Sequence, residues 1–367
     1  MKIAFIGTRG IPARYGGFET CAEEIAKRLV KKGHEVWVYG RSGYYPHQDT
    51  MYEAIHLVYL REIRAKFFET FLHTGLSLLH ALARRFDVLM VFNVANSPWL
   101  LIPLALGKKT VVHVDGLEWM RPKWHGLGRR YYQWAERLAV RLPLPLISDS
   151  QEIRKYFRER YGRETRYISY GAVLQASRDP SRLGPLGLTP EGYFLQIARF
   201  EPENNQLLSI RAFEGLETKK KLVLVGGATY ASKYAREISP TRDPRIVLLG
   251  FCYDRDLLRE LLCHCFAYIH GNEVGGTNPG LLQAMASGCF VIARDVPFNR
   301  EVGGDAAVYF NKSADDLRGK MAWALGQPDL APMKDKARKI IESRYSWDAM
   351  ADAYERLFVS VASGSQR

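Results

Sequence analysis

The chain of 367 residues is 47% apolar and 25% charged, a balance typical of a soluble globular protein with two domains of roughly 150–200 residues each. Its longest apolar run, residues 91–106, is shorter than the ~18–20 residues that a membrane-spanning helix needs, and its five scattered cysteines do not indicate a disulfide framework. The net charge of +13 lies mainly in residues 1–171, which carry 27 Lys and Arg against 16 Asp and Glu, so this half is expected to face an anionic partner.

The chain opens with a strand, a glycine-rich loop and a helix. Lys2–Ile6 is predicted as a strand, and its apolar run is too short for a signal peptide. Gly7–Pro12 turns out of this strand, and Gly16-Gly17 leads into a helix over Phe18–Lys31. A second strand follows at Glu35–Tyr39. This βαβ unit predicts a parallel sheet that binds ligands at the carboxyl ends of its strands.

Two common nucleotide-binding motifs do not occur in the sequence. Gly7 and Gly10 fit only part of the Gly-x-Gly-x-x-Gly fingerprint, and no acidic residue ends the second strand. A nicotinamide-dependent dehydrogenase is therefore disfavoured. No Walker A pattern is present either, which disfavours a P-loop nucleotidase.

The segment Arg61–Arg85 combines an apolar stripe with basic ends. The stripe consists of Phe67, Phe68, Phe71, Leu72, Leu76, Leu79, Leu82 and Ala83, and the basic residues are Arg61, Arg64, Lys66, Arg84 and Arg85. Two interpretations stay open for this segment. It is either a helix that packs its stripe into the core or an interfacial helix that lies on an anionic membrane leaflet.

Further apolar runs predict two successive series of strands and helices. The predicted strands are Val88–Phe92, Thr110–Val114, Leu146–Ile147 and Thr165–Ile168, then Tyr193–Ile197, Lys221–Val225, Arg245–Leu249, Ala267–Ile269 and Phe290–Ala293. Two such series in one chain predict two α/β domains. The hinge is expected within Gly171–Pro190, which is rich in Gly, Pro and Ser.

The most informative stretch joins the strand at Ala267–Ile269 to a helix that is predicted to begin near Pro279. The intervening loop contains Gly275 and Gly276, which let a bulky anion approach the backbone closely. Proline suits the first helical turn, and free backbone N–H groups at a helix start attract phosphate. The residues alone therefore predict a cradle for a diphosphate or a sugar.

No metal site is expected. Cys263-His264-Cys265 comes nearest to a metal-binding pattern, but Leu261, Leu262, Phe266 and Ile269 on either side indicate ordinary core positions.

A series of motifs in fixed order carries a family resemblance. The motifs are Gly7-Thr8-Arg9-Gly10-Ile11-Pro12, Tyr15-Gly16-Gly17-Phe18-Glu19, Val114-Asp115-Gly116-Leu117-Glu118-Trp119, Ser148-Asp149-Ser150, Tyr170-Gly171-Ala172, Ala198-Arg199-Phe200-Glu201-Pro202-Glu203-Asn204-Asn205, His270-Gly271, Val274-Gly275-Gly276-Thr277-Asn278-Pro279, and Tyr345-Ser346-Trp347 with Tyr354-Glu355. The set resembles glycosyltransferase family 4, the retaining enzymes of the GT-B fold. Within it, the chain looks like a bacterial subgroup that includes β-1,4-rhamnosyltransferases of capsule and exopolysaccharide assembly.

The resemblance implies an α/β fold of the GT-B type, with two Rossmann-like domains facing across a cleft. Residues 1–171 would form an acceptor-side domain and residues 172–345 the nucleotide-sugar-binding domain. Residues 346–367 would form a C-terminal helix that crosses back to the first domain.

Arg199 matches the arginine that the family uses on the donor diphosphate, where a guanidinium neutralises charge on the leaving nucleotide. Five residues later the family usually has lysine, whereas this chain has Asn204, which could donate only a neutral hydrogen bond. Two further family positions carry glutamate and fall here on Gly275 and Gln283. The second commonly holds the ribose hydroxyls, so Gln283 is compatible with a deoxyribose and hence with a dTDP-sugar.

The resemblance assigns the other candidate residues to the donor and its sugar. Gly16 and Gly17 match a loop near the donor phosphate and the acceptor, and Asp115 and His270 fall beside the sugar. A simple turn at Asp115 and a core histidine at position 270 stay open as alternatives. The remaining donor-binding candidates are Val274, Gly276, Thr277 and Asn278, and the role of Glu273 is open.

By resemblance, the chain is a retaining, metal-independent glycosyltransferase whose only co-substrate is a dTDP- or UDP-sugar, with no further cofactor. The leaving phosphate serves as the base in such enzymes, so the catalytic set would be Asp115, Arg199 and His270 without a protein nucleophile. The expected donor is dTDP-L-rhamnose, and the expected acceptor is a lipid-linked saccharide. The expected location is cytoplasmic, in peripheral contact with the anionic inner face of the membrane.

Three alternatives remain from the sequence. One is another GT-B activity, such as transfer from a UDP-hexose or UDP-N-acetylhexosamine, or a UDP-sugar epimerase. The second is a non-catalytic relative that binds a nucleotide sugar, since Asn204 and Gln283 depart from the family pattern. A nucleic-acid partner is disfavoured because the basic residues show no aromatic-interleaved motif.

Overall fold

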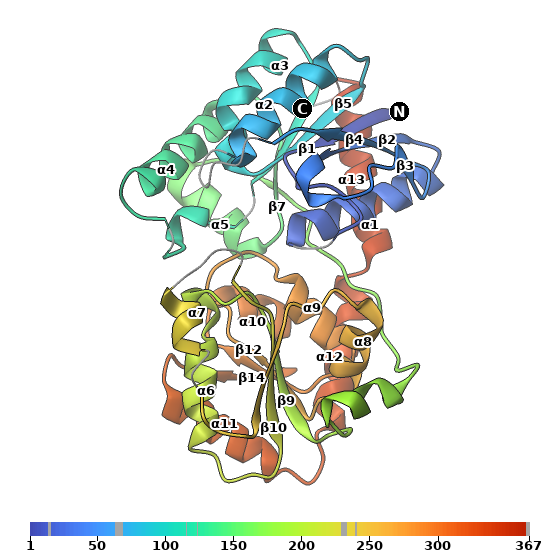
Figure 1. Ribbon diagram of the computed structural model, residues 1–367. Coiled ribbons are helices and arrows are strands. Elements are labelled where there is room, and N and C mark those ends of the chain that lie inside the picture. The colour runs from blue at the N-terminus through green and yellow to red at the C-terminus, as the bar shows by residue number, and fades with distance from the viewer. Residues whose placement is uncertain are drawn as a thin grey trace. The chain divides into compact units, whose positions relative to one another are not determined.

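The computed structural model describes residues 1–13, 16–62, 69–114, 116–122, 124–228, 233–238 and 241–364. The chain forms two compact units (Figure 1). Unit 1 comprises Met1–Tyr170 together with Trp347–Arg367, and unit 2 comprises Gly171–Ser346. The chain thus leaves unit 1 after Tyr170 and re-enters it at Trp347, and the predicted hinge segment Gly171–Pro190 belongs to unit 2.

Unit 1 is built on an eight-stranded sheet in the order β3-β4-β2-β1-β5-β6-β7-β8. All neighbouring strands are parallel except β3 and β4, which form an antiparallel hairpin. The strands are β1 (Lys2–Ile6), β2 (Glu35–Arg41), β3 (Met51–Tyr52), β4 (Ile55–Leu60), β5 (Val88–Phe92), β6 (Thr110–His113), β7 (Leu146–Ser148) and β8 (Arg166–Tyr167).

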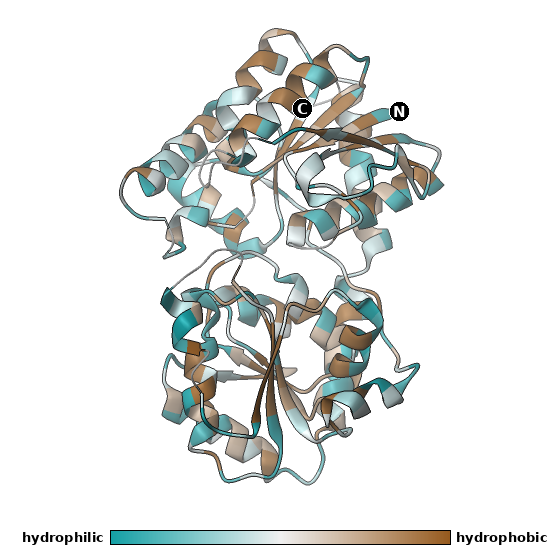
Figure 2. Cartoon of the chain, viewed as in Figure 1, coloured by the Kyte–Doolittle hydropathy of each residue, from teal (hydrophilic) through white to brown (hydrophobic). Residues whose placement is uncertain are grey.

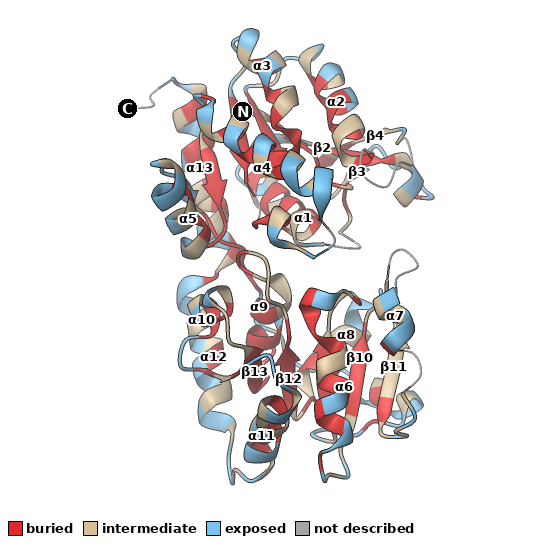
Figure 3. Cartoon of the chain, turned by 90° about the vertical axis from the view of Figure 1, so that its left-hand side faces the viewer, coloured by how far each residue is buried: buried red, intermediate tan, exposed pale blue. Residues whose placement is uncertain are grey.

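The central strands of unit 1 are apolar along their length because both faces of the sheet are covered. Ile3 of β1 lies between Val36 of β2 and Val88 of β5, and every residue of β5 is buried. Such continuous apolar runs are typical of parallel strands under two helical layers. Figure 2 shows this apolar interior in both units, and Figure 3 shows the buried strands beneath helices with exposed outer faces.

The helices of unit 1 form two groups. The helices are α1 (Gly17–Lys31), α2 (Glu69–Leu82), α3 (Leu101–Ala105), α4 (Gly126–Arg141), α5 (Gln151–Tyr161) and α13 (Trp347–Ala362), with the 3₁₀ helices η1 (Ser42–Tyr44), η2 (Val94–Leu100) and η3 (Glu118–Met120). Helix α1 packs against α13, whereas α2 and α4 both pack against η2. Right-handed crossovers between parallel strands put α2, η2 and α4 on the face of the sheet opposite α1.

Helix α13 supplies part of the core of unit 1 although it comes from the end of the chain. The Phe358 ring lies 6.2 Å from the Phe5 ring of β1, and the Tyr354 hydroxyl lies 3.7 Å from Cys21 Sγ of α1. Both aromatic residues are fully buried. One face of the first sheet is therefore completed by residues that lie more than 300 positions from its first strand.

The stripe predicted within Arg61–Arg85 is only partly described, since residues 63–68 lie outside the described residues. In α2, the buried residues are Glu69, His73, Thr74, Gly75, Ser77, Leu78 and Ala81. Leu76 and Leu79 are exposed instead. The core-facing interpretation of the stripe is therefore wrong for these two leucines, because α2 buries a largely polar and small-residue face.

Unit 2 is built on a six-stranded, fully parallel sheet in the order β11-β10-β9-β12-β13-β14. The strands are β9 (Tyr193–Ile197), β10 (Lys221–Val225), β11 (Ile246–Gly250), β12 (Ala267–His270), β13 (Val291–Arg294) and β14 (Ala307–Phe310). Successive strands run outward in one direction from β9 and in the other from β12. The order thus reverses between β9 and β12, the place where ligands bind in such sheets.

The helices of unit 2 cover this sheet. They are α6 (Gln206–Glu214), α7 (Lys233–Ile238), α8 (Arg255–Cys263), α9 (Pro279–Ala286), α10 (Pro297–Gly303), α11 (Ala314–Leu325) and α12 (Ala331–Arg344), with the 3₁₀ helices η4 (Pro180–Leu186) and η5 (Pro202–Asn204). Strand and helix residues such as Phe194, Phe213, Phe290 and Phe310 share one buried aromatic and aliphatic cluster. This rigid core fixes the strand ends on which the candidate site stands.

Candidate functional site

In unit 2, the loops after β9 and β12 lie directly against each other. A Cβ atom added to Gly271, which follows β12, would lie 2.2 Å from the carbonyl oxygen of Asn204. The Asn205 side-chain amide donates to the Gly271 carbonyl oxygen at 2.8 Å. Only glycine permits this approach, so residues on the two loops share one small region at the switch point of the sheet.

Arg199 stands on the loop after β9 and is braced through its backbone. Its carbonyl oxygen accepts hydrogen bonds from the side-chain amides of Asn204, at 2.9 Å, and Gln206. The Arg199 side chain is half-buried, whereas Asn204 is buried. Asn204 therefore holds the turn that carries Arg199, a use of the amide that the sequence did not suggest.

His270 ends β12 and is buried beside Tyr268, with the two rings stacked at 6.1 Å. Burial lowers the pKa of His270 to about 3, so the imidazole is neutral at physiological pH. The structure thus makes His270 a neutral, enclosed ring directly before the loop.

The role of Glu273, open from the sequence, is to anchor this loop. Its carboxylate accepts hydrogen bonds from Arg294 Nε at 3.1 Å and Lys312 Nζ at 2.7 Å. Burial alone would raise the pKa of Glu273, but hydrogen bonds from Lys312, Asn205 and Arg294 lower it below its ordinary value. The ionised carboxylate ties the loop after β12 to the ends of β13 and β14.

The loop ends at the start of α9. Pro279 is the first helical residue, as predicted, and the Asn278 side chain accepts the Gly280 N–H at 2.9 Å as an N-terminal cap. Asn278 is thus occupied by the helix. The other loop candidates precede it, with Gly276 and Thr277 buried, Val274 and Gly275 half-buried, and Gly275 at a φ of 153°.

Gln283 is the one candidate on α9 beyond its first turn. Its side chain is exposed, whereas its neighbours Leu282 and Ala284 are buried in the core. It therefore has no packing function that would prevent a role in binding a ligand.

In unit 1, the glycine-rich loop after β1 is held by two buried carboxylates of α1. Glu19 Oε1 accepts the backbone N–H of Arg9 at 2.8 Å, and Glu23 Oε2 accepts that of Ala13 at 2.5 Å. Lys27 pairs with Glu23 at 2.7 Å. The sequence analysis missed this role of Glu23. Its signal is the i, i+4 spacing of Glu19, Glu23 and Lys27, which places all three on one face of α1.

The candidates of unit 1 are only partly described. Gly16 is exposed and precedes α1, which begins at Gly17. Asp115 lies outside the described residues, but the preceding strand ends in His113, which is stacked between Phe92 at 5.6 Å and Tyr170 at 5.9 Å. Burial lowers the pKa of His113 to about 3, so this ring is neutral too.

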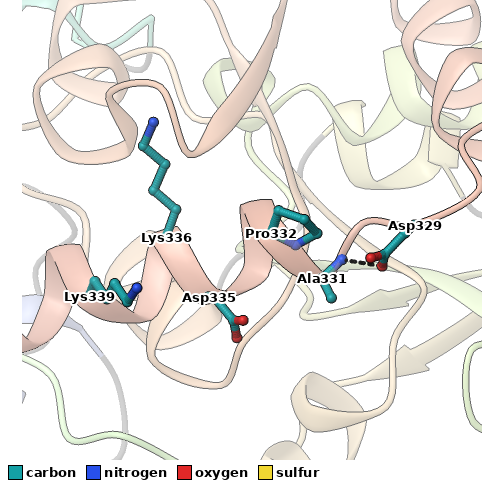
Figure 4. A pocket seen from close by; sticks show the side chains of 6 residues that line it. All are labelled: Asp329, Ala331, Pro332, Asp335, Lys336 and Lys339. Carbon is teal, nitrogen blue, oxygen red and sulfur yellow. Dashed lines mark hydrogen bonds between the residues drawn. The ribbon is translucent and has the colours of Figure 1, made fainter.

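A surface hollow at the start of α12 contains none of the candidate residues (Figure 4). It is lined by Asp329, Ala331, Pro332, Asp335, Lys336 and Lys339. The Asp329 carboxylate accepts the Ala331 backbone N–H at 2.7 Å, so its charge stabilises the helix start. Among the described residues, no three His, Cys, Asp or Glu side chains are grouped as metal ligands would be.

Two family models match the chain, one for each half. Residues 15–173 match glycosyltransferase family 4, and residues 186–347 match the glycosyl transferases group 1. Together with the two doubly wound sheets, these matches define a glycosyltransferase of the GT-B fold. The chain thus consists of a glycosyltransferase family 4 domain followed by a glycosyl transferases group 1 domain.

Several solved structures share this fold. Sucrose-phosphate synthase from Thermosynechococcus elongatus superposes with a TM-score of 0.81 at 16% identity, over 99% of either chain. HepE from Anabaena, in complex with UDP, gives 0.77 at 18% identity, over 98% of this chain and 100% of that one. WaaG, a glycosyltransferase involved in lipopolysaccharide biosynthesis, gives 0.74 at 17% identity, over 95% and 98%. No curated protein sequence matches the chain significantly.

In the part of the chain that the structure describes, no helix is both long enough and apolar enough to cross a membrane.

Proposed function

We propose that the chain transfers a sugar from a nucleoside-diphosphate donor to a lipid-linked saccharide, and that L-rhamnose from dTDP-L-rhamnose is the sugar. One observation carries the proposal. Arg199 and Val274–Thr277 lie on the loops after β9 and β12, the two strands that flank the switch point, and the Gly271–Asn204 contact keeps the two loops together.

The donor diphosphate lies against this pair of loops. The Arg199 guanidinium neutralises the negative charge that grows on the leaving phosphate, which is the main protein contribution in a retaining transfer without a protein nucleophile. Gly275 and Gly276 let the phosphate oxygens approach backbone N–H groups. His270, neutral and enclosed, contributes a hydrogen-bonding edge rather than a charge.

Gln283 supports a thymidine nucleotide. Its exposed amide can bind one ribose hydroxyl, but it lacks the carboxylate that would hold a vicinal diol most strongly. A deoxyribose offers only one of these two hydroxyls. The choice of dTDP over UDP therefore rests on this side chain.

The test is binding of a nucleotide panel to the purified protein, followed by product analysis. Ligands that bind the folded state raise its melting temperature, so dTDP and dTDP-L-rhamnose should give larger shifts than UDP and UDP-glucose at equal concentration. Transfer of rhamnose to a lipid-linked disaccharide should then be detectable by mass spectrometry. Shifts with UDP species alone would replace rhamnose by another sugar, and no shift with any nucleotide would refute a donor site.

A second candidate is a transferase that uses a UDP-linked hexose. It is favoured by the structural neighbour HepE, which has been solved with UDP and with UDP-glucose. The same panel separates the two candidates.

A further inference from the structure

Helix α2 of unit 1 has an inverted arrangement of polar and apolar residues. Two polar residues of its inner face are hydrogen-bonded to β2, since His73 Nε2 lies 3.0 Å from the Gly40 carbonyl oxygen and Glu69 accepts from the Arg41 guanidinium at 2.8 Å. The outer face carries Leu76 and Leu79, which are 44% and 52% exposed. An unpaired outer leucine stripe needs an explanation outside the fold of unit 1.

Exposed apolar side chains continue from α2 onto the neighbouring helices. Leu101, the first residue of α3, and Leu106, which follows its last residue, are 48% and 59% exposed, and Leu127 and Trp134 of α4 are 81% and 50% exposed. We call these four residues, together with Leu76 and Leu79, the α2–α4 face. They include nearly half of the large apolar side chains that are exposed in the described residues.

Aromatic contacts show that α2, η2 and α4 adjoin beneath this face. The Phe71 ring of α2 lies 5.1 Å from Trp99 of η2 and 6.2 Å from Tyr131 of α4. Tyr131 in turn lies 5.9 Å from Trp134. The exposed residues therefore belong to one continuous helical layer, which Figure 1 shows as α2, α3 and α4 on one side of unit 1.

Helix α4 also places basic side chains on this surface. Leu127, Arg130, Trp134, Arg137 and Arg141 follow one another at intervals of three and four residues, so they form a single stripe, and each is exposed. Among the described residues, none of these three arginines forms an ion pair with another side chain. The acidic residue of α4, Glu136, points inward and accepts hydrogen bonds from Tyr156 and Tyr161.

We propose that the α2–α4 face docks on the surface of a bilayer that contains anionic lipids. Leucine and tryptophan side chains enter the interface between headgroups and acyl chains, and the arginine stems extend so that their guanidinium groups contact lipid phosphates. A protein partner of this face would have to supply acidic groups among apolar ones, whereas an anionic leaflet supplies both at once.

Docking through the α2–α4 face brings the protein to the bilayer that holds a lipid-linked acceptor. The docking proposal rests on the proposed function only for this purpose. Binding to vesicles can be measured without any sugar transfer. The two proposals can therefore fail independently.

The experiment measures flotation of the full chain with two kinds of vesicle, pure phosphatidylcholine and phosphatidylcholine with 30% phosphatidylglycerol. The wild-type protein should float only with the anionic vesicles, and less of it at high salt. The triple variant Arg130→Glu, Arg137→Glu, Arg141→Glu should bind at least a hundredfold more weakly, because each cation near an anionic surface contributes about fivefold in affinity. Leu76→Ser with Leu79→Ser should weaken binding at low and high salt alike.

Matched controls make the same kinds of change in charge and hydropathy outside the α2–α4 face. The triple variant Arg211→Glu, Lys219→Glu, Lys339→Glu changes three exposed cations of unit 2, and Val359→Ser changes an exposed apolar residue of α13. Both should float like the wild-type protein. Equal flotation of the α4 variant and its control would overturn the proposal. The proposal would also be overturned if the wild-type protein bound neither kind of vesicle and changes to the α2–α4 face abolished self-association instead.

Transfer to a short-chain, water-soluble acceptor separates the two proposals. The α4 triple variant should keep this activity although it no longer binds the vesicles. A wild-type protein that binds vesicles but transfers no sugar to such an acceptor would refute the proposed function and leave the docking face in place.

Discussion

The two units share one architecture but hold their first loops by different chemistry. In unit 1, two buried carboxylates, Glu19 and Glu23, accept backbone N–H groups of the glycine-rich loop. In unit 2, neutral amides hold the corresponding turn, and Asn204 donates to the Arg199 carbonyl oxygen. Unit 1, which carries the large positive charge, thus holds its first loop with negatively charged side chains. Unit 2, which is nearly neutral, holds the turn of Arg199 with uncharged side chains.

The difference shows where charge matters in each unit. Nearly half of the basic excess in residues 1–171 lies on α4 and α5, which together carry eight Lys and Arg against three Glu. In unit 2 the charge proposed to act on the donor is local, since Arg199 lies on a turn that is held by neutral amides. Net charge along a sequence therefore indicates a partner for the outer surface of unit 1 and says little about the chemistry in unit 2.

The largest effect is expected from the arginine of unit 2. Arg199→Ala should lower kcat by roughly 10²–10³-fold, because the charge on the leaving diphosphate loses its guanidinium. Steady-state kinetics with the donor identified by the panel is the measurement. Arg211→Ala, an exposed arginine of α6, should leave the rate unchanged, and a similar loss in both variants would remove the special role of Arg199.

The next effect concerns the carboxylate brace of unit 1. Glu23→Ala should destabilise the protein by about 2–3 kcal/mol, since it removes a buried acceptor of the Ala13 N–H and the more buried of the two carboxylates that pair with Lys27. Urea unfolding measures this change. Glu24→Ala, one position along α1, removes a more exposed pair with Arg28 and should cost about 0.5 kcal/mol. Equal costs would mean that the brace does not stabilise the loop.

Glu273 gives unit 2 a smaller and pH-dependent effect. The pKa of its carboxyl is lowered in the folded protein, because hydrogen bonds from Lys312, Asn205 and Arg294 outweigh its burial. Its contribution to stability is therefore complete above its ordinary pKa of about 4.3 and is lost as the pH falls through the lower folded value. Glu273→Gln should destabilise at pH 7 in urea unfolding, and its difference from the wild-type protein should shrink as the pH falls below the ordinary pKa. Glu217→Gln, an exposed site, is the control; a pH-independent difference for Glu273→Gln would exclude the charge as the cause.

The smallest effect sharpens the donor preference. Gln283→Glu should raise the affinity for UDP by about fivefold, roughly 1 kcal/mol, and change that for dTDP much less, because only the ribose offers a second hydroxyl to the new carboxylate. Isothermal titration with both nucleotides measures the shift. An equal change in affinity for the two nucleotides would show that residue 283 does not contact the sugar ring of the nucleotide.

The sequence predicts the buried strands well but not the hairpin of β3 and β4. Strands such as β1 and β5 are continuous apolar runs and are confirmed within a residue. The hairpin turns at Glu53 and Ala54, whose φ values are 46° and 61°. Such turns usually contain Asn or Gly, so the sequence carries no turn signal there. Strand β14 was missed as well, because it lies at the edge of its sheet and only its two end residues are buried.

The elements that carry the candidate residues could be predicted from the sequence, but the contacts of those residues could not. The loop after β12 and the start of α9 at Pro279 follow from local signals. The anchoring of Glu273 depends on Arg294 and Lys312, which lie 21 and 39 positions away. The outward leucines of α2 likewise depend on Arg41 of β2, which makes the polar inner face possible. Partners so distant in sequence leave no local pattern.

The return of α13 to unit 1 has a consequence for protein synthesis. A ribosome releases unit 2 as one uninterrupted segment, so this unit can close its core while the last helix is still in the exit tunnel. Residues 1–170 of unit 1 have by then left the ribosome, yet Phe5 and Cys21 still lack the Phe358 and Tyr354 side chains that cover them. The half made first is therefore the half finished last, and until α13 emerges, the nascent chain presents an open apolar surface of the kind that chaperones bind.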